Sequence, residues 1–298
     1  MAAYRSVGIV ANPQRSEVPD TVRTALRWLR ERGLEALGAP GLAEPLELDL
    51  PSFAWEGLPA RVDLLLTFGG DGTILHAARH LAGQPVPIFG VNTGHLGFLT
   101  SSSRASMLTS FELLFEGRGT AESHMSLRAA VRTADEGPHD SPGEAPVALN
   151  DVVLHKGALT SRVLTLQLEV GGEEVGTYVA DGLILATPAG STGYTLSAQG
   201  PLVVPTMDAI VATPICPHTL AIRPVVLPAS SEIRVTVVEQ QERASLAADG
   251  RPVAELEIGD VVRVTRAEGA VLLVRLPGQS FFRLLRSKLH WGGRVSHG

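Results

Sequence analysis

The stretch RVDLLLTFGGDGTILHAARHLAG, residues 61–83, constrains the fold more than any other part of the chain. It places a continuous apolar run before a glycine-rich turn, followed by a helical pattern with Ile74, Ala77, Ala78 and Leu81 on one side. An unbroken apolar run is typical of a strand buried on both faces, and a helix directly after it indicates a right-handed βαβ unit. The segment therefore predicts a parallel sheet covered by helices.

The same alternation of strand and helix continues through residues 1–120. YRSVGIVANP, at residues 4–13, predicts a buried strand that ends at its proline. Residues 20–32 predict a helix with Asp20 as its N-cap and Gly33 as its stop, and a further strand and helix follow in VPIFGVNTG and ASMLTSFELLFEG. We expect an α/β domain over this part of the chain.

The pattern changes after residue 120. Short runs rich in β-branched residues, among them SEIRVTVVEQ and AVLLVRL, are separated by turn residues, and many of them alternate between apolar and polar positions. Alternation of this kind predicts an all-β domain of two packed sheets over residues 121–282, and the polar stretch TADEGPHDSPGEAP predicts a surface hairpin tip within it.

Composition excludes several classes of protein. The net charge is −6 and no block of lysine or arginine stands out, which argues against broad nucleic-acid binding. No apolar run approaches the roughly 20 residues that span a bilayer, and the first ten residues lack a charged leader. The only cysteine, Cys216, excludes an intramolecular disulfide and a multi-cysteine metal site. These features predict a cytoplasmic protein without a membrane anchor.

The turn GGDGT contains an acidic residue, Asp71, where phosphate-binding turns usually carry lysine or hydroxyl groups. Glycines and a following helix N-terminus favour an anion, so Gly69, Gly70, Gly72 and Thr73 form a candidate turn for a phosphate donor. The turn matches neither the Walker A motif nor the dinucleotide fingerprint. Three interpretations of the aspartate remain open: a helix cap, a ligand of Mg²⁺, and a proton acceptor for an attacking hydroxyl.

A second unusual stretch is ATPAGSTGYTLSAQGP, residues 186–201, which is too irregular for a strand. Long loops in compact domains are usually functional. Its hydroxyl groups and free amides suit a phosphorylated or polyhydroxylated ligand, and Tyr194 offers a face for stacking. A serine-hydrolase interpretation fails because the stretch has no G-x-S-x-G elbow.

Several motifs together resemble the NAD kinase family: GGDGT, GVNTGHLGFLT, LNDVVLHKG, DGLILATPAGSTGYTLSAQGP and the tail FFRLLRSKLHW, in this order. The resemblance implies an α/β N-terminal domain, a β-rich C-terminal domain and a tail, residues 283–298, that returns to the first domain. It implies transfer of the γ-phosphoryl group of ATP, or of polyphosphate, to the 2′-hydroxyl of the adenosine ribose of NAD. Mg²⁺ or another divalent cation and assembly into homodimers or homotetramers are also implied.

The resemblance assigns Asp71 as the proton acceptor and places Gly72 against the ligand. The other residues that it places at NAD are Asn150, Asp151, Asp181, Ala189, Thr192, Gly193, Tyr194, Thr195, Leu196 and Ser197. The carboxylates of Asp151 and Asp181 suit hydrogen bonds from ribose hydroxyls or amide donors. Aspartate is also a common turn or cap residue, which is the competing interpretation for both.

Cations for the phosphates are few, because the chain has only two lysines, Lys156 and Lys288, and neither is near the turn in sequence. His76 and Arg79 are the local candidates, and Arg162 is a third; surface solvation is the competing interpretation for each. No metal ligands are assigned. Arg251 stands where many members of the family have glutamine, which leaves the preference for the phosphate donor open.

Two other functions remain as alternatives at this stage. A kinase of a lipid or sugar acceptor shares the GGDGT turn, but it predicts an apolar groove or a membrane-binding surface. A catalytically silent NAD(P)-binding sensor gives no reason to keep the carboxylate of Asp71 beside a phosphate.

Overall fold

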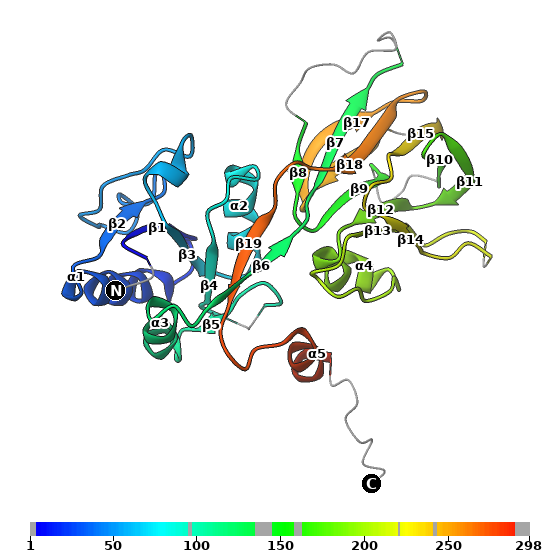
Figure 1. Ribbon diagram of the computed structural model, residues 1–298. Coiled ribbons are helices and arrows are strands. Elements are labelled where there is room, and N and C mark those ends of the chain that lie inside the picture. Colours follow the sequence, from blue (N-terminus) through cyan, green and yellow to red (C-terminus); the bar gives the residue numbers. More distant parts are fainter. Residues whose placement is uncertain are drawn as a thin grey trace. The chain divides into compact units, whose positions relative to one another are not determined.

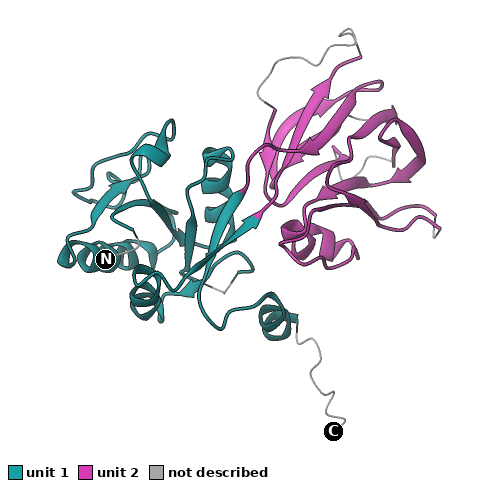
Figure 2. Cartoon of the chain, viewed as in Figure 1, with its two compact units in different colours: residues 1–123, 271–298 teal, residues 124–270 magenta. Residues whose placement is uncertain are grey.

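A computed structural model describes residues 4–94, 97–134, 145–157, 163–219, 221–240 and 243–289. The chain divides into two compact units, residues 1–123 with 271–298, and residues 124–270 (Figure 2). Most of the polar stretch expected as a hairpin tip, and Arg162, lie outside the described residues.

The first unit is an α/β structure built on a seven-stranded sheet (Figure 1). Its elements are β1 (Ser6–Ala11), α1 (Val18–Glu31), β2 (Glu35–Gly38), the 3₁₀ helix η1 (Leu58–Ala60), β3 (Leu64–Gly69), α2 (Asp71–Leu81), β4 (Ile88–Asn92), β5 (Ser102–Ser103), α3 (Met107–Phe115), β6 (Thr120–His124), β19 (Val271–Arg275) and α5 (Phe281–Leu289). The strand order is β2-β1-β3-β4-β19-β6, with β5 paired to β4.

The expected parallel sheet is confirmed, because β1 pairs in parallel with β2 and β3, β3 with β4, and β4 with β19. Helices α1 and α3 share one hydrophobic cluster with Leu64, Leu66 and Phe68 of β3. Helix α2 packs against the other face, where Ile74 lies next to Gly90 of β4. All four residues expected on the inner side of α2 are buried.

Three details differ from the sequence-based expectations. The N-cap of α1 is Glu17, and Asp20 lies inside the first turn of the helix. Proline at the second helical position, Pro19, fits that earlier start, because proline is tolerated in the first turn. Helix α2 begins at Asp71, so the second half of the GGDGT turn is already helical.

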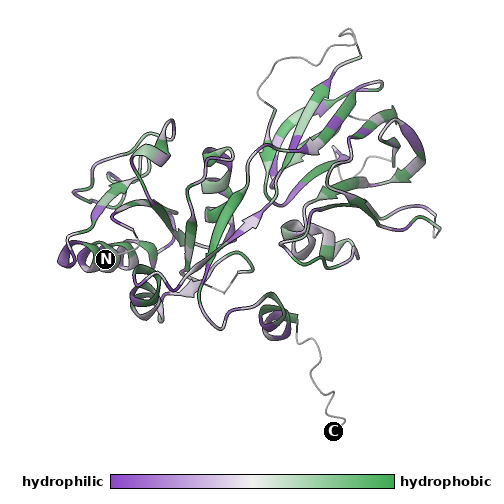
Figure 3. Cartoon of the chain, viewed as in Figure 1, coloured by the Kyte–Doolittle hydropathy of each residue, from purple (hydrophilic) through white to green (hydrophobic). Residues whose placement is uncertain are grey.

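The third difference concerns AVLLVRL, which we assigned to the β-rich domain. Its residues form β19, which lies between β4 and β6 in the sheet of the first unit. Strand β19 is mostly hydrophobic, whereas the neighbouring strand β6 is mostly hydrophilic (Figure 3). Because β19 lies in the interior of its sheet, its sequence is a continuous apolar run. Strands of a β-sandwich can have similar local sequences.

The second unit contains two six-stranded sheets in which every described strand pair is antiparallel. Their orders are β11-β10-β15-β18-β7-β8 and β14-β13-β12-β9-β16-β17. The strands are β7 (Leu127–Arg132), β8 (Val147–Ala148), β9 (Asp151–Lys156), β10 (Leu164–Val170), β11 (Glu173–Ala180), β12 (Gly182–Ala186), β13 (Ala209–Ile215), β14 (Val225–Pro228), β15 (Ile233–Glu239), β16 (Ala244–Ala248), β17 (Arg251–Leu256) and β18 (Val261–Arg266).

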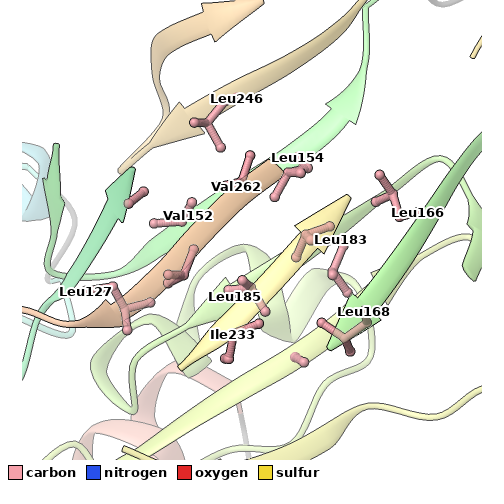
Figure 4. Close-up of a cluster of buried hydrophobic side chains, with 14 of the residues drawn as sticks. Leu127, Val152, Leu154, Leu166, Leu168, Leu183, Leu185, Ile233, Leu246 and Val262 are labelled. Atoms are coloured by element: carbon pink, nitrogen blue, oxygen red, sulfur yellow. The ribbon is translucent and has the colours of Figure 1, made fainter. Parts of the chain in front are cut away.

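A single hydrophobic cluster joins the two sheets of this unit. Leu166, Ile233 and Val262 come from one sheet, and Leu154 and Leu183 from the other (Figure 4). The expected pair of packed sheets is therefore confirmed. The stretch after β12, which we expected as an irregular loop, contains a 3₁₀ turn, η2 (Ala189–Thr192), and a short helix, α4 (Tyr194–Ser197). Within the described part of the chain, no helix is long and apolar enough to cross a membrane.

Candidate active site

The carboxyl ends of the parallel strands in the first unit meet at one edge of its sheet. Adjacent strands β1 and β3 are followed by helices that cover opposite faces, α1 on one and α2 on the other. From β1 the chain continues to β2 on one side, and from β3 it continues to β4 on the other side. Ligands of open α/β sheets bind where the connections change direction in this way. The GGDGT turn follows β3 directly and therefore lies at this position.

Asp71 is the first residue of α2, and the N-cap is Gly70. The carboxylate of Asp71 accepts hydrogen bonds from the amides of Phe98 at 2.8 Å and Leu99 at 3.1 Å. Both amides belong to the GVNTGHLGFLT segment, residues 90–100, and lie after the end of β4. The aspartate thus links the two glycine-rich segments and is not the N-cap of its own helix.

Two glycines make this close approach possible. A Cβ atom at position 97 would overlap the Oδ1 atom of Asp71, and a Cβ atom at position 69 would overlap the Oγ1 atom of Thr73. Any larger residue would therefore displace one of these two side chains. Gly69 and Gly97 thus allow Thr73 and Asp71 to keep their observed positions.

The candidate cations His76 and Arg79 lie together on α2. The Nη2 atom of Arg79 lies 3.3 Å from a ring nitrogen of His76 and 3.3 Å from a ring nitrogen of His80. The rings of both histidines contact Trp55, and that of His80 stacks on it at a centroid distance of 4.8 Å. His76 and Arg79 thus belong to a cluster formed by side chains of α2 together with Trp55.

Arg15, which the sequence analysis did not single out, lies beside the turn. Its Nη2 atom is 3.7 Å from a Cβ atom built at Gly70, and its Nη1 atom is 3.0 Å from one built at Gly94. Within the described residues, its exposed side chain forms no hydrogen bond or ion pair. Arg15 follows β1 at the same edge, and only the pairing of β1 with β3 brings it to the turn.

The second unit contains a sharp bend at Asn150, just before β9. The carboxylate of Asp249 accepts hydrogen bonds from the amides of Leu149 at 2.9 Å, Asn150 at 2.7 Å and Asp151 at 3.2 Å. In return, the amide of Asp249 donates to the carbonyl of Asp151 at 2.9 Å. Asp249 was missed from the sequence, although it lies in an Ala-Asp-Gly triplet, residues 248–250, like that of Asp181 at residues 180–182.

Asp151 is only 6% exposed. Burial, together with the nearby charge of Asp249, raises the pKa of the Asp151 carboxyl from 3.8 to about 7. Removal from water disfavours the charged carboxylate, and a neighbouring like charge adds to the effect. Asp151 therefore changes its protonation state near neutral pH.

The segment after β12 packs directly on this bend. The hydroxyl of Thr187 donates to the carbonyl of Leu149 at 2.6 Å, and the amide of Thr187 donates to the carbonyl of Asn150 at 2.8 Å. A Cβ atom at Gly190 lies 2.0 Å from that same carbonyl of Asn150. The Oδ1 atom of Asn150 is buried and has no partner among the described residues.

The structure brings together part of the set expected at NAD. A Cβ atom at Gly193 lies 3.8 Å from the Nδ2 atom of Asn150 and 3.9 Å from the Oδ2 atom of Asp151. Ala189 is 3% exposed and Thr195 is fully buried, with its hydroxyl unpartnered within the described region, whereas Tyr194 is 45% exposed. The remaining members of the set, Thr192, Leu196 and Ser197, lie in the same two turns, η2 and α4.

Asp181 lies apart from this cluster in the second unit. Strand pairing places Gly182 opposite His155 and Ala186 opposite Asp151, so Asp181 is at the far end of β12 from the bend. Its carboxylate forms an ion pair with Lys156 at 2.7 Å.

Comparison with known proteins agrees with the motifs. Residues 7–118 match the ATP-NAD kinase N-terminal domain, and residues 149–276 match the ATP-NAD kinase C-terminal domain. The chain is 38% identical over 290 residues to an NAD kinase of Syntrophotalea carbinolica, covering 97% of this chain and 100% of that protein. It is 46% identical over 232 residues to an NAD kinase of Gemmatimonas aurantiaca, covering 78% of each chain.

Two solved structures have similar folds. Yeast NADH kinase in complex with NADH superimposes with a TM-score of 0.88 at 27% identity, covering 99% of this chain and 90% of that one. An NAD kinase from Archaeoglobus fulgidus in complex with ATP gives a TM-score of 0.70 at 25% identity, covering 96% and 98%. With both domains matched and a relative 38% identical along nearly its full length, the chain belongs to the NAD kinase family.

Proposed function

We propose that the chain transfers the γ-phosphoryl group of ATP to the 2′-hydroxyl of the adenosine ribose of NAD, with Asp71 as the proton acceptor. The proposal rests on one observation above all. The Asp71 carboxylate is held by two backbone amides at the carboxyl edge of a parallel sheet, beside a glycine-rich turn. A fixed carboxylate at this position suits a reaction that removes a proton next to phosphate.

In the proposed step, the 2′-oxygen of NAD forms a bond to the γ-phosphorus while the bond from that phosphorus to the bridging oxygen breaks. ADP leaves with the electron pair of the broken bond, and Asp71 takes the hydroxyl proton. Carboxylate oxygens have further lone pairs, so the bonds from Phe98 and Leu99 leave room for this proton.

For the phosphate donor, we propose the turn formed by Gly69, Gly70, Gly72 and Thr73. The N-terminus of α2 favours anions there. We add Arg15 as the cation that reaches this turn, because its guanidinium lies against Gly70. Charge neutralisation and positioning supply most of the catalysis of phosphoryl transfer.

A divalent cation fits the proposal as part of the ATP complex. The described residues contain no group of three or more His, Cys, Asp or Glu side chains that could hold a metal. Mg²⁺ is commonly bound by phosphates with one or two carboxylates and water. Bound in this way, the ion would neutralise charge on the β- and γ-phosphates, and no cage of protein ligands is required.

For NAD, we propose the cluster around the bend at Asn150 and Asp151, with Ala189 and the run Thr192–Ser197. The buried, unpartnered Oδ1 atom of Asn150 supports this, because buried acceptors usually have a donor. The exposed ring of Tyr194 suits stacking on a base. Asp181 remains a proposed contact that the family resemblance implies, and His76 and Arg162 remain candidate cations for the phosphates.

We further propose a homodimer or homotetramer in the cytoplasm. The single cysteine agrees with a reducing compartment. Strand β14 is at the edge of its sheet, and its Val226 is 50% exposed. Exposed apolar residues on a sheet edge favour pairing with another chain. Light scattering on the purified protein tests this, and a monomer would refute it.

The activity is tested by incubating the purified protein with NAD, Mg²⁺ and either ATP or polyphosphate, and assaying NADP. No NADP with either donor would overturn the proposal. We expect Asp71→Asn to lower kcat by at least about 10²-fold while calorimetry still detects NAD binding. We expect Arg15→Met to raise the KM for ATP and leave the KM for NAD unchanged.

A further inference from the structure

The segment that holds Asp71 is itself held from its other side by Arg275. Arg275 is the last residue of β19, and its side chain is only 12% exposed. Its Nη2 atom donates to the carbonyl of Phe98 at 2.9 Å, and its Nη1 atom donates to the carbonyls of Leu99 at 3.1 Å and Thr100 at 3.2 Å. One largely buried guanidinium therefore binds three successive carbonyls.

The orientation of this guanidinium is also fixed. Its Nε atom donates to the carboxylate of Glu122 at 3.3 Å, so all three guanidinium nitrogens are engaged. Five donors in a rigid plane let arginine bind several acceptors at once in one orientation. A lysine ammonium cannot reproduce that arrangement.

One peptide group connects Arg275 with Asp71. The carbonyl of Phe98 and the amide of Leu99 belong to the same planar peptide unit and point in opposite directions. The carbonyl accepts from Arg275 at 2.9 Å, and the amide donates to Asp71 at 3.1 Å. Rotation of this peptide plane therefore breaks both hydrogen bonds together, and a bond at one end favours the orientation needed at the other.

We propose that Arg275 is a positioning residue for phosphoryl transfer. It holds the Phe98–Leu99 peptide with the amide directed at Asp71, and it thereby keeps the carboxylate oriented toward the 2′-hydroxyl. This rests on the proposed role of Asp71 as proton acceptor. Arg275 itself contacts neither substrate in this mechanism.

A purely structural role makes a different prediction. If Arg275 only joins β19 to the neighbouring loop, its loss reduces stability and lowers activity by the same factor whether or not Asp71 is present. If it acts through Asp71, its loss has no further effect once the carboxylate has been replaced. A double-mutant cycle on kcat separates the two.

The experiment compares the wild type, Arg275→Met, Asp71→Asn and the double variant in the NADP assay. We expect Arg275→Met to lower kcat by about 10- to 100-fold, since small misplacements of a reacting group cost up to about 10²-fold. The KM for NAD should change by less than about twofold, because Arg275 does not contact NAD. In the Asp71→Asn background, the same substitution should change kcat by less than about twofold.

Arg275→Lys is the second arginine variant, for use if Arg275→Met does not fold by circular dichroism. It keeps the charge and one or two of the carbonyl bonds, so we expect about a tenfold loss of kcat and the same lack of additivity.

Arg32→Met is the matched control. Arg32 forms an ion pair with Glu112 at 2.6 Å and also donates to the carbonyl of Trp28. It lies at the C-terminal end of α1. Because a helix in a βαβ unit runs antiparallel to its strands, this end lies at the opposite edge of the sheet from the GGDGT turn. The kcat of Arg32→Met should equal that of the wild type.

Three results would overturn the inference, and they differ in whether they also refute the role of Asp71. Equal losses from Arg275→Met in both backgrounds, or a wild-type kcat in that variant, would refute the role of Arg275 and leave the proposed function intact. A wild-type kcat in Asp71→Asn would refute the role of Asp71 and, with it, that of Arg275.

Discussion

Substitution of Asp151 by asparagine should remove a pH-dependent destabilisation of the second unit. The pKa of this carboxyl is about 7 in the folded chain, against 3.8 for the unfolded reference, because burial and the charge of Asp249 disfavour ionisation. The folded state therefore keeps a proton that the unfolded state has already lost between these two values. Stability must fall as the pH rises through this window, and the loss is complete above it.

The size of the effect follows from the two pKa values. Each unit of pKa difference corresponds to about 1.4 kcal/mol, so ionising Asp151 costs the fold about 4 kcal/mol well above pH 7. At about pH 5 the cost is near 2 kcal/mol, because the folded carboxyl is still protonated while the unfolded one is ionised. Between about pH 5 and about pH 8.5 the wild type should lose roughly 3 kcal/mol more than Asp151→Asn.

Urea unfolding of both proteins at these two pH values measures that difference, since titrations of all other groups cancel between them. Asp208→Asn is the matched control, because Asp208 is 63% exposed and pairs with Arg266 in the same unit. It should follow the wild type at both pH values. The reasoning fails if the gap between the wild type and Asp151→Asn is the same at pH 5 and pH 8.5.

Three further predictions concern the close contacts of the two glycine-rich regions. Gly97→Ala places a methyl group 1.7 Å from a carboxylate oxygen of Asp71, so we expect kcat to fall by about 10²-fold with the KM for ATP preserved, as steady-state kinetics can measure. Asp249→Ala removes the acceptor of three amides at the bend, and thermal unfolding should show a loss of about 2–4 kcal/mol; an unchanged midpoint would contradict the bonds described. Gly190→Ala directs a methyl group into the carbonyl of Asn150, and it should weaken NAD binding in calorimetry; unchanged binding would contradict a role of this contact at NAD.

Much of the fold followed from local patterns. The continuous apolar run before GGDGT predicted a buried parallel strand, and the spacing of Ile74, Ala77, Ala78 and Leu81 predicted the inner side of α2, because burial on two faces or on one stripe dictates those patterns. The two-sheet arrangement of the second unit followed from its alternating runs for the same reason.

Other features had no local signal. The apolar run that forms β19 is equally suited to a sandwich and to a central parallel strand, and only pairing with β4 decides between them. Asp20 is a good N-cap residue in isolation, yet the chain starts α1 earlier, with Glu17 as the N-cap. Propensities of single residues are weak against the packing of a whole helix.

The sequence by itself determined the chemistry available to this protein: an aspartate within a glycine-rich turn, an Asn-Asp pair and a loop rich in hydroxyl groups. Such groups are recognisable because glycine-rich turns and long polar loops interrupt the periodic patterns of strands and helices. Only the tertiary structure decided which partners orient them. Arg15, Asp249 and Arg275 reach their contacts through strand pairing and long-range hydrogen bonds, and contacts between residues far apart in the chain leave no periodic trace in the sequence.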